Sequence, residues 1–384
     1  MIPYGRQDIS QADIDAVTDV LKSDFLTQGP AIPRFEASVA KRVGAIHALA
    51  MNSATSALHA AVAALGVGPG DVVWTSPITF VASANCARYC GAEVDFVDID
   101  PDTFNMSADA LETKLTHAKA QGRLPKVVIP VHMGGQSPDM ARIHALCASE
   151  GIGIVEDASH SIGASYRDQP VGACLYSDIT VFSFHPVKII TTAEGGMATT
   201  NNPDLASRMD LLRSHGVTRD EAMMDVPTHG PWYYQQISLG WNYRLTDIQA
   251  ALGLSQIDRL DDFVDTRNRM AERYDVLLAD LPVVRPGRIT GARSSFHLYV
   301  VRLPEADSVR HRRVFEALRA GGIGVNLHYI PVHLHPYYAA QGFALGDFPQ
   351  SEDYYNRAIS IPLHPNLTQA EQDTVVSTLR AALS

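Results

Sequence analysis

The chain has 384 residues, with 31 Lys and Arg against 42 Asp and Glu, which gives a formal net charge of −11. At roughly 100–200 residues per domain, this length predicts two or three domains. The hydrophobic content of 46% excludes a wholly disordered chain. The acidic balance argues against nucleic acid or an anionic membrane as the main partner.

Targeting and cysteine patterns add to this picture. The sequence has no run of about 18 apolar residues, and its first residues have no apolar signal-peptide core. We therefore expect a globular, cytoplasmic protein without membrane spans. The four cysteines are too few and too irregularly spaced for a disulfide framework or a zinc site. His328, His333 and His335 lack a nearby set of carboxylates, so we expect no metal.

Short apolar runs alternate with helix-like segments in the first half of the chain. The runs predict strands at residues 72–74, 94–98, 127–131, 153–156 and 179–184. The helices are expected at residues 54–65, 83–90 and 138–150. Because the runs show no polar alternation, they suit strands buried on both faces. The order of elements therefore predicts an α/β fold with a largely parallel sheet.

The amino-acid composition changes near residue 281. Residues 245–281 are amphipathic and predict a long helix leading out of the first domain, and residues 281–293 are rich in Pro and Gly. We therefore predict a large α/β domain at residues 1–280 and a small α+β domain at residues 281–384. Its expected elements are a strand at 296–303, a helix at 309–320, a strand at 325–329 and a helix at 369–383.

The glycines between residues 66 and 70 resemble a dinucleotide-binding loop only superficially. That motif follows a strand and opens a helix, whereas here a helix precedes the glycines and a strand follows. A helix C-cap followed by a turn explains them better. A nicotinamide-dependent oxidoreductase is therefore unsupported.

One lysine stands out from the six in the chain. Lys188 is the only lysine after residue 126, and it lies in an apolar segment at residues 182–190. A lysine in such a setting is costly unless it is paired or deprotonated, and burial lowers its pKa. A neutral amine in a pocket is what Schiff-base chemistry requires. Taken alone, Lys188 also fits a salt-bridged or snorkelling side chain.

Two further features lie where a cofactor would need them. Asp157 ends a predicted strand, where α/β sheets place ligands and where a carboxylate can hold a pyridine nitrogen protonated. Residues 52–56 (NSATS) precede a predicted helix, whose N-terminus is a ready phosphate site. Helix caps would explain each feature separately. Together with Lys188, they indicate a site for pyridoxal 5′-phosphate (PLP).

At these positions and others the chain resembles the DegT/StrS-type sugar aminotransferases, a family of fold type I PLP enzymes. The resemblance covers nearly the whole chain. Its motifs are residues 26–30 (LTQGP), 52–58 (NSATSAL), 76–80 (SPITF), 156–160 (EDASH), 183–188 (SFHPVK), 192–196 (TAEGG), 212–216 (LRSHG), 242–247 (NYRLTD), 328–333 (HYIPVH) and 359–363 (ISIPL).

The resemblance implies roles for individual residues. Lys188 would hold PLP and move the proton in transamination, Asp157 would pair with the pyridine nitrogen, and His160 would contact the phenolic oxygen, where many members have glutamine. Other cofactor contacts would come from Ala54, Thr55, Phe80, Ser183 and Asn242. The substrate pocket would be lined by Tyr4, Asp24, Phe25, Leu26, Thr27, Arg244, Asn326, Leu327, His328 and Tyr329. For Phe80 core packing remains an alternative, and for Arg244 a structural ion pair.

In this family Asn242 reaches the cofactor phosphate of the neighbouring subunit, so a homodimer is implied. Within the family the chain is most similar to members that aminate a UDP-linked 4-keto-6-deoxy-N-acetylhexosamine in pseudaminic acid biosynthesis, with L-glutamate as donor. A transaminase for a GDP- or dTDP-linked keto sugar remains an alternative. Sugar dehydratases of this fold replace the lysine with histidine, so Lys188 argues against them. A catalytically silent PLP-fold regulator would be expected to lack Lys188 or Asp157, and both are present.

Overall fold

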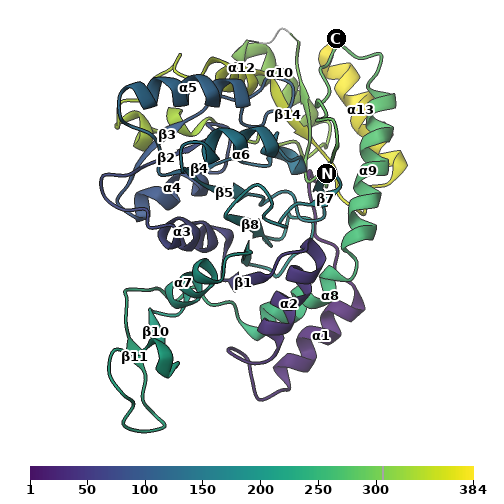
Figure 1. Cartoon of the computed structure of the whole chain (residues 1–384). Helices are drawn as coiled ribbons and strands as arrows, with labels where there is room; N and C mark the ends of the chain where they lie inside the picture. Colours follow the sequence, from purple (N-terminus) through teal and green to yellow (C-terminus); the bar gives the residue numbers. More distant parts are fainter. Residues whose placement is uncertain (305–306) are drawn as a thin grey trace.

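The computed structural model describes residues 1–304 and 307–384. Its centre is a seven-stranded sheet in the order β1-β9-β8-β5-β4-β2-β3 (Figure 1). Every neighbouring pair is parallel except those made by β9, which runs against β1 and β8. The strands are β1 (His47–Met51), β2 (Val72–Thr75), β3 (Glu93–Phe96), β4 (Val127–Ile129), β5 (Gly153–Asp157), β8 (Ile179–Ser183) and β9 (Gly196–Thr200).

Helices cover both faces of this sheet, as expected for strands without polar alternation. Val73 packs into a core with α3, α4 and α7, while its neighbour Trp74 packs into another with α5 and α6. A third core joins β8 and β9 to α2, α8 and the first half of α9. These helices are α2 (Ala31–Val43), α3 (Ala54–Ala64), α4 (Ala82–Tyr89), α5 (Ala108–Ala120), α6 (Met140–Ala148), α7 (Pro203–Arg213), α8 (Asp247–Ile257) and α9 (Leu260–Leu277).

The C-terminal part has its own core around an antiparallel pair of strands, which also takes in the second half of α9. Its elements are β13 (Tyr299–Arg302), α10 (Ser308–Ala320), η3 (Val332–Leu334), α11 (Pro336–Ala339), α12 (Pro349–Arg357), β14 (Ala358–Ile361) and α13 (Gln369–Leu383). Since α9 contributes to cores on both sides of it, the division at residues 280 and 281 stays a prediction. No helix in the described ranges is long and apolar enough to cross a membrane.

Two elements differ from the sequence expectation. The predicted long helix at residues 245–281 is interrupted between α8 and α9, where Arg259 binds Asp8 at 2.5 Å and Asp13 at 2.6 Å. The predicted strand at residues 325–329 is absent. Among the residues that the structure describes, its only ladder contact is a single bridge between Asn326 and Ser360, so these residues form a loop instead.

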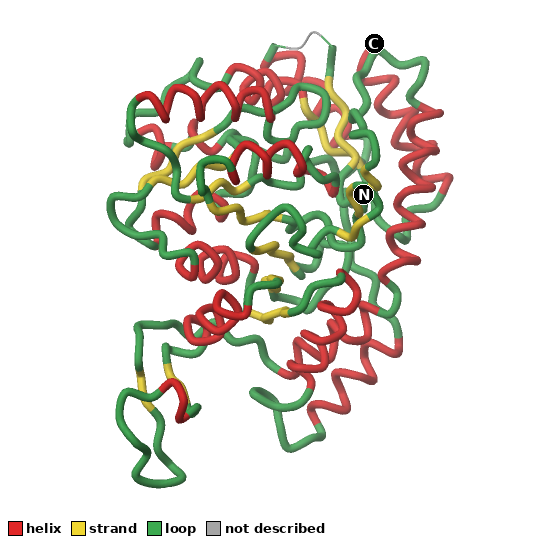
Figure 2. Tube along the Cα trace, in the orientation of Figure 1, coloured by secondary structure: helices red, strands yellow, loops and turns green. Residues whose placement is uncertain are grey.

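A hairpin arm projects from the body of the protein. It contains β10 (Val217–Thr218), η2 (Glu221–Met223) and β11 (Gln235–Gln236), and it extends well beyond the other elements (Figures 1 and 2). Four of its large apolar side chains are exposed: Val226, Trp232, Tyr234 and Leu239. Exposed apolar side chains gathered on one projection mark a surface for association.

The remaining elements are α1 (Gln11–Leu21), β6 (Ser165–Tyr166), β7 (Gln169–Pro170), η1 (Met133–Gly135) and β12 (Ala292–Arg293).

The sheet and α3 meet where Gly196 opens β9. Gly196 pairs with Met51 on one side and Ser183 on the other. A Cβ atom at Gly196 would lie 2.5 Å from the backbone of Ser53 and Ala54. Only glycine allows this approach, so Gly196 sets how closely the N-terminus of α3 sits against the sheet.

We predict that Gly196→Ala lowers the free energy of unfolding by about 1–3 kcal/mol, because the added methyl group overpacks this contact. Urea unfolding followed by circular dichroism measures the change. Gly68→Ala is the matched control, since its Cβ would meet open space. Its effect should stay within about 0.5 kcal/mol. Equal effects of the two substitutions would contradict the packing argument.

Candidate active site

Asp157 is a buried carboxylate at the carboxyl end of β5, and only 5% of its surface is exposed. Its Oδ2 atom accepts a hydrogen bond from Ser83 Oγ at 2.6 Å, and its Oδ1 atom accepts one from Ser159 N at 3.1 Å. Ser83 lies in the first turn of α4 and is also bonded to Thr79 at 2.6 Å. The carboxylate is therefore held in one orientation.

Lys188 follows β8 in a short loop. No hydrogen bond or ion pair to its amine occurs in the described part of the chain, which excludes the salt-bridged alternative. Part of its surface remains accessible to solvent, but protein surrounds the amine. Burial lowers the pKa of Lys188 to about 8, and the negative charge of Asp157 opposes this shift. A substantial fraction of the amine is therefore neutral near physiological pH.

The N-terminus of α3 offers free backbone donors. Ser53 caps the helix by accepting from Ser56 N at 3.1 Å, and Ser56 Oγ donates to Asn52 Oδ1 at 2.6 Å. The ordinary cap is thus present. The N–H groups of Ala54 and Thr55 still have no acceptor among the described residues. Together with the helix dipole they suit a phosphate group.

His160 is buried, and both of its ring nitrogens are engaged. Nδ1 accepts a hydrogen bond from Gly134 N at 3.3 Å, and Nε2 lies 3.2 Å from the hydroxyl of Tyr329. Burial, followed by electrostatic interactions with Lys188, His328 and His132, holds the pKa of His160 well below its usual value. The ring is therefore neutral in this site.

Phe80 and the predicted sugar-pocket residues gather around the same place. Phe80 is 59% exposed and its ring lies 6.3 Å from that of Tyr329, so core packing does not explain it. Tyr4 lies 5.3 Å from the ring of His328 and bonds to the side chain of Asn326. Leu327 packs in the same cluster as Tyr4 and Tyr329.

Ser183, Asn242 and Arg244 border the phosphate-like site at the start of α3. Ser183 ends β8 next to Gly196 and is buried. The carbonyl of Asn242 accepts from Asn52 Nδ2 at 3.2 Å, while its own side chain is exposed. Arg244 bridges to Met51, and its guanidinium has no acidic partner among the described residues. This observation removes the structural ion pair as an explanation for Arg244.

The stretch Asp24, Phe25, Leu26 and Thr27 is not brought into this group. All four residues are exposed, and the stretch is attached to the start of α8, where Asp247 N donates to Leu26 O at 3.0 Å. Within the described residues, no hydrogen bond or ring contact joins it to Lys188, His160 or Phe80. Its assignment to the substrate pocket stays a prediction.

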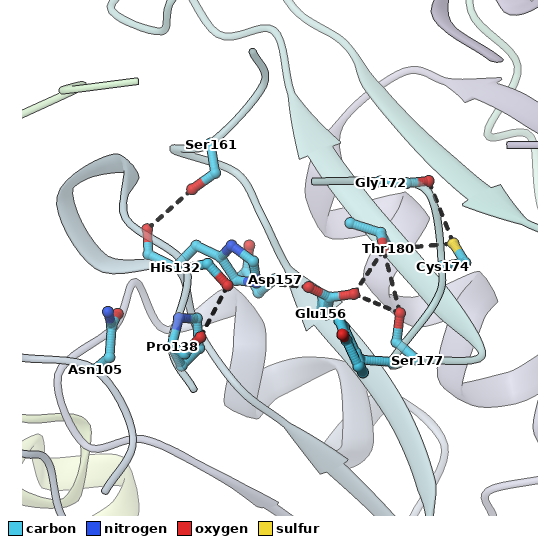
Figure 3. Close-up of polar contacts among 12 residues, drawn as sticks. Asn105, His132, Pro138, Glu156, Asp157, Ser161, Gly172, Cys174, Ser177 and Thr180 are labelled. Carbon is cyan, nitrogen blue, oxygen red and sulfur yellow. Dashed lines mark hydrogen bonds and ion pairs between the residues drawn. The ribbon is translucent and has the colours of Figure 1, made fainter. Parts of the chain in front are cut away.

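The structure also adds residues that the sequence did not single out. Glu156 lies beside Asp157 but points to the other face of β5, toward Ser177 and Thr180 (Figure 3). His132 Nε2 lies 2.8 Å from Glu156. Burial alone would raise the pKa of Glu156, but hydrogen bonds from His132, Ser177 and Thr180 hold it below its usual value. Because successive side chains of a strand point to opposite faces, the sequence alone could have placed Glu156 on the other face of the strand from Asp157.

The histidines considered for metal binding have other contacts. His333 is buried against Glu352, with Nε2 2.9 Å from Oε1. The carboxylate of Glu352 is occupied by Gly346 N as well. Within residues 1–304 and 307–384 no group of three or more His, Cys, Asp or Glu could hold a metal ion.

Comparison with known proteins places this geometry in context. Residues 7–380 match the DegT/DnrJ/EryC1/StrS aminotransferase family. The chain is 39% identical to the spore coat polysaccharide biosynthesis protein SpsC of Bacillus subtilis, over 99% of this chain and 96% of the relative. It is 36% identical to the UDP-4-amino-4,6-dideoxy-N-acetyl-beta-L-altrosamine transaminase of Campylobacter jejuni, over 100% and 98% of the two chains.

Solved structures agree. The PMP form of the putative sugar aminotransferase Spr1654 from Streptococcus pneumoniae superimposes with a TM-score of 0.92 at 32% identity, covering 100% of this chain and 99% of that one. Helicobacter pylori PseC, described as an aminotransferase involved in the biosynthesis of pseudoaminic acid, gives 0.91 at 31% identity with the same coverage. The protein is therefore a PLP-dependent sugar aminotransferase of fold type I and belongs to the DegT/DnrJ/EryC1/StrS aminotransferase family.

Proposed function

We propose that the protein transfers the amino group of L-glutamate to C4 of a UDP-linked 4-keto-6-deoxy-N-acetylhexosamine, in pseudaminic acid biosynthesis. The observation that carries the transaminase chemistry is the unpartnered amine of Lys188, with its pKa of about 8, close to the charge of Asp157. The substrate is supported by the names of the Campylobacter jejuni and Helicobacter pylori relatives. SpsC is a similarly close relative, so another nucleotide-linked keto sugar is the alternative.

The residues present fit PLP. When bound, PLP supplies a carbonyl group that takes up the amino group and a ring that stores the electron pair released at the substrate. The free N–H groups of Ala54 and Thr55, with Ser183, would bind its phosphate. Asp157 would hold the ring nitrogen protonated, and the exposed ring of Phe80 would stack on its face.

Lys188 would act twice. Its neutral amine would bind the cofactor as a nucleophile, which explains why burial matters. After displacement by the incoming amino group, the freed amine would take the proton from Cα of glutamate and deliver it to C4′, and then run the reverse sequence with the keto sugar. His160 would donate a hydrogen bond to the phenolic oxygen.

The substrates would be bound through groups that are remote from the reacting carbon. Arg244 offers a guanidinium fork without an acidic partner, which suits a carboxylate of the amino donor. Tyr4, Asn326 and the residues up to Tyr329 would line the sugar pocket. Binding energy from the nucleotide would position the ketone at the cofactor.

A homodimer completes the proposed site. The exposed side chain of Asn242 would reach the cofactor phosphate of the partner subunit, and the exposed stretch from Asp24 to Thr27 would face the partner's pocket. The projecting hairpin arm, with exposed Trp232 and Leu239, supports this arrangement because it provides apolar surface to bury. The cytoplasmic location remains a prediction from composition.

The first test is an absorbance spectrum of the purified protein before and after addition of L-glutamate. We expect a yellow, lysine-bound PLP that bleaches to the amine form, and a UDP-linked keto sugar should restore the colour. Lys188→Ala should lack both changes while keeping its circular dichroism spectrum. Absence of a yellow form after incubation with PLP would overturn the proposal and favour the non-catalytic regulator.

The pKa of Lys188 predicts how PLP uptake depends on pH. Because the amine reacts only when neutral, the rate at which the apoprotein binds PLP covalently should rise about tenfold per pH unit below about pH 7 and level off above about pH 9. Stopped-flow absorbance measures this rate. A rate that keeps rising toward pH 10 would indicate a solvated lysine instead.

Subunit complementation tests the role of Asn242. Lys188→Ala and Asn242→Ala chains are inactive by prediction, but a mixed dimer would contain one site with Lys188 from one chain and Asn242 from the other. Refolding the two variants together should therefore restore up to about a quarter of the wild-type activity per chain. A mixture of Lys188→Ala with the double variant is the control, and it should stay inactive. No restoration in the first mixture would mean that Asn242 does not cross to the partner.

A further inference from the structure

Residues 294–298, called the strap here, cross behind His160 from a distant part of the sequence. Ser295 Oγ donates to the carbonyl of His160 at 2.8 Å. Ser295 N donates to Gly135 O at 3.0 Å, and Leu298 N donates to Gly134 O at 3.1 Å. The ring of His297 lies 4.4 Å from the ring of His160, measured between centroids. The strap thus contacts both the main-chain carbonyl and the imidazole ring of His160.

Gly134 and Gly135 make this approach possible. Both have positive φ, at 68° and 105°. A Cβ atom at Gly135 would lie 2.7 Å from Ser295 Oγ and 2.9 Å from the backbone nitrogens of Phe296 and His297. The same turn directs Gly134 N–H at Nδ1 of His160. A donor at Nδ1 leaves Nε2 as the protonated nitrogen of the neutral ring.

A buried arginine holds the strap from behind. Arg267 in α9 is 1% exposed and has no carboxylate partner among the described residues. Its Nη1 atom donates to the carbonyls of Phe296, His297 and Leu363, at 3.1, 3.4 and 2.9 Å. Asn268 adds a bond from Nδ2 to Ser294 O at 3.0 Å. A buried cation that binds only carbonyls is costly to move, so these bonds fix the strap.

We propose that the strap and Gly134 fix His160 as the neutral tautomer with its proton on Nε2, and that Ser295 is a positioning residue for this purpose. The inference deepens the proposed role of His160 and rests on it: the Nε2–H bond now directed at Tyr329 is the one that would serve the phenolic oxygen of PLP. An imidazole has two tautomers and a cationic form, and only the neutral Nε2–H tautomer can accept the Gly134 N–H at Nδ1 and also donate from Nε2, as a glutamine amide would donate.

The groups around His160 act in the same direction. They are Lys188 after β8, His132 after β4, His297 on the strap, and His328 and Tyr329 from the loop before η3. None of these five is a carboxylate, and the carboxylate of Asp157, three residues earlier, is bonded to Ser83 and Ser159 rather than to His160. The single tautomer should therefore persist between about pH 6 and pH 9.

The experiment is nitrogen NMR of the full-length apoprotein labelled with ¹⁵N-histidine, with His160 assigned by loss of its signals in His160→Gln. We expect a pyridine-type Nδ1 and a pyrrole-type Nε2 over this pH range. Ser295→Ala should mix the two tautomers and weaken PLP binding about three- to tenfold, the size of one hydrogen bond. Ser161→Ala is the matched control: it deletes a buried hydroxyl that donates to His132 O and does not contact the strap (Figure 3).

The conservative variant separates positioning from general packing. In a His160→Gln background, Ser295→Ala should leave PLP affinity unchanged, since an amide needs no tautomer to be selected. An imidazolium or Nδ1–H signature in the wild type, an unchanged tautomer in Ser295→Ala, or an equal effect of Ser161→Ala would each overturn the inference. The inference would also be overturned if Ser295→Ala lowered PLP affinity as much in the His160→Gln background as it does in the wild type. The NMR result does not depend on transamination, so failure of the proposed function would be seen separately.

Discussion

The structure depends on one buried negative charge. Asp157 ends β5 in the middle of the sheet, and a carboxylate there needs compensation because burial disfavours its charged form. Ser83 and Ser159 each provide one hydrogen bond, and the positive charge of Lys188 lies within electrostatic range. These three interactions come from α4, the loop after β5 and the loop after β8, so the carboxylate links three separate segments of the chain.

The same charge sets the chemistry of Lys188. Burial lowers the pKa of the amine, and the negative charge of Asp157 raises it, so that the pKa is about 8. A higher pKa would leave too little neutral amine to react, while a lower one would leave too weak a base to accept a proton from Cα. The balance explains why the amine has no direct partner: an ion pair would hold it protonated.

The sequence predicts β2, β3, β4, β5 and β8 of the sheet and helices α3, α4, α6, α10 and α13, because these depend on local patterns, but it does not predict the antiparallel strand β9. Lys188 and Asp157 stand out by rarity and by position at a strand end, and residues 52–56 by their place before α3. The break before α9 was missed, and the residues that bind Arg259 there, Asp8 and Asp13, are far away in the chain. The loop at residues 325–329 is as apolar as a strand, but only Asn326 finds a ladder partner.

His160 shows where local pattern ends and tertiary structure begins. A glutamine amide at this position would carry a donor in every state, whereas an imidazole must have its proton placed by its surroundings. In this chain the surroundings come from Gly134, 26 residues earlier, and Ser295, 135 residues later. Neither position carries a recognisable motif of its own. An imidazole at this position therefore depends on its surroundings, and in the proposed arrangement Gly134 and the strap together supply the selectivity that the side chain itself lacks.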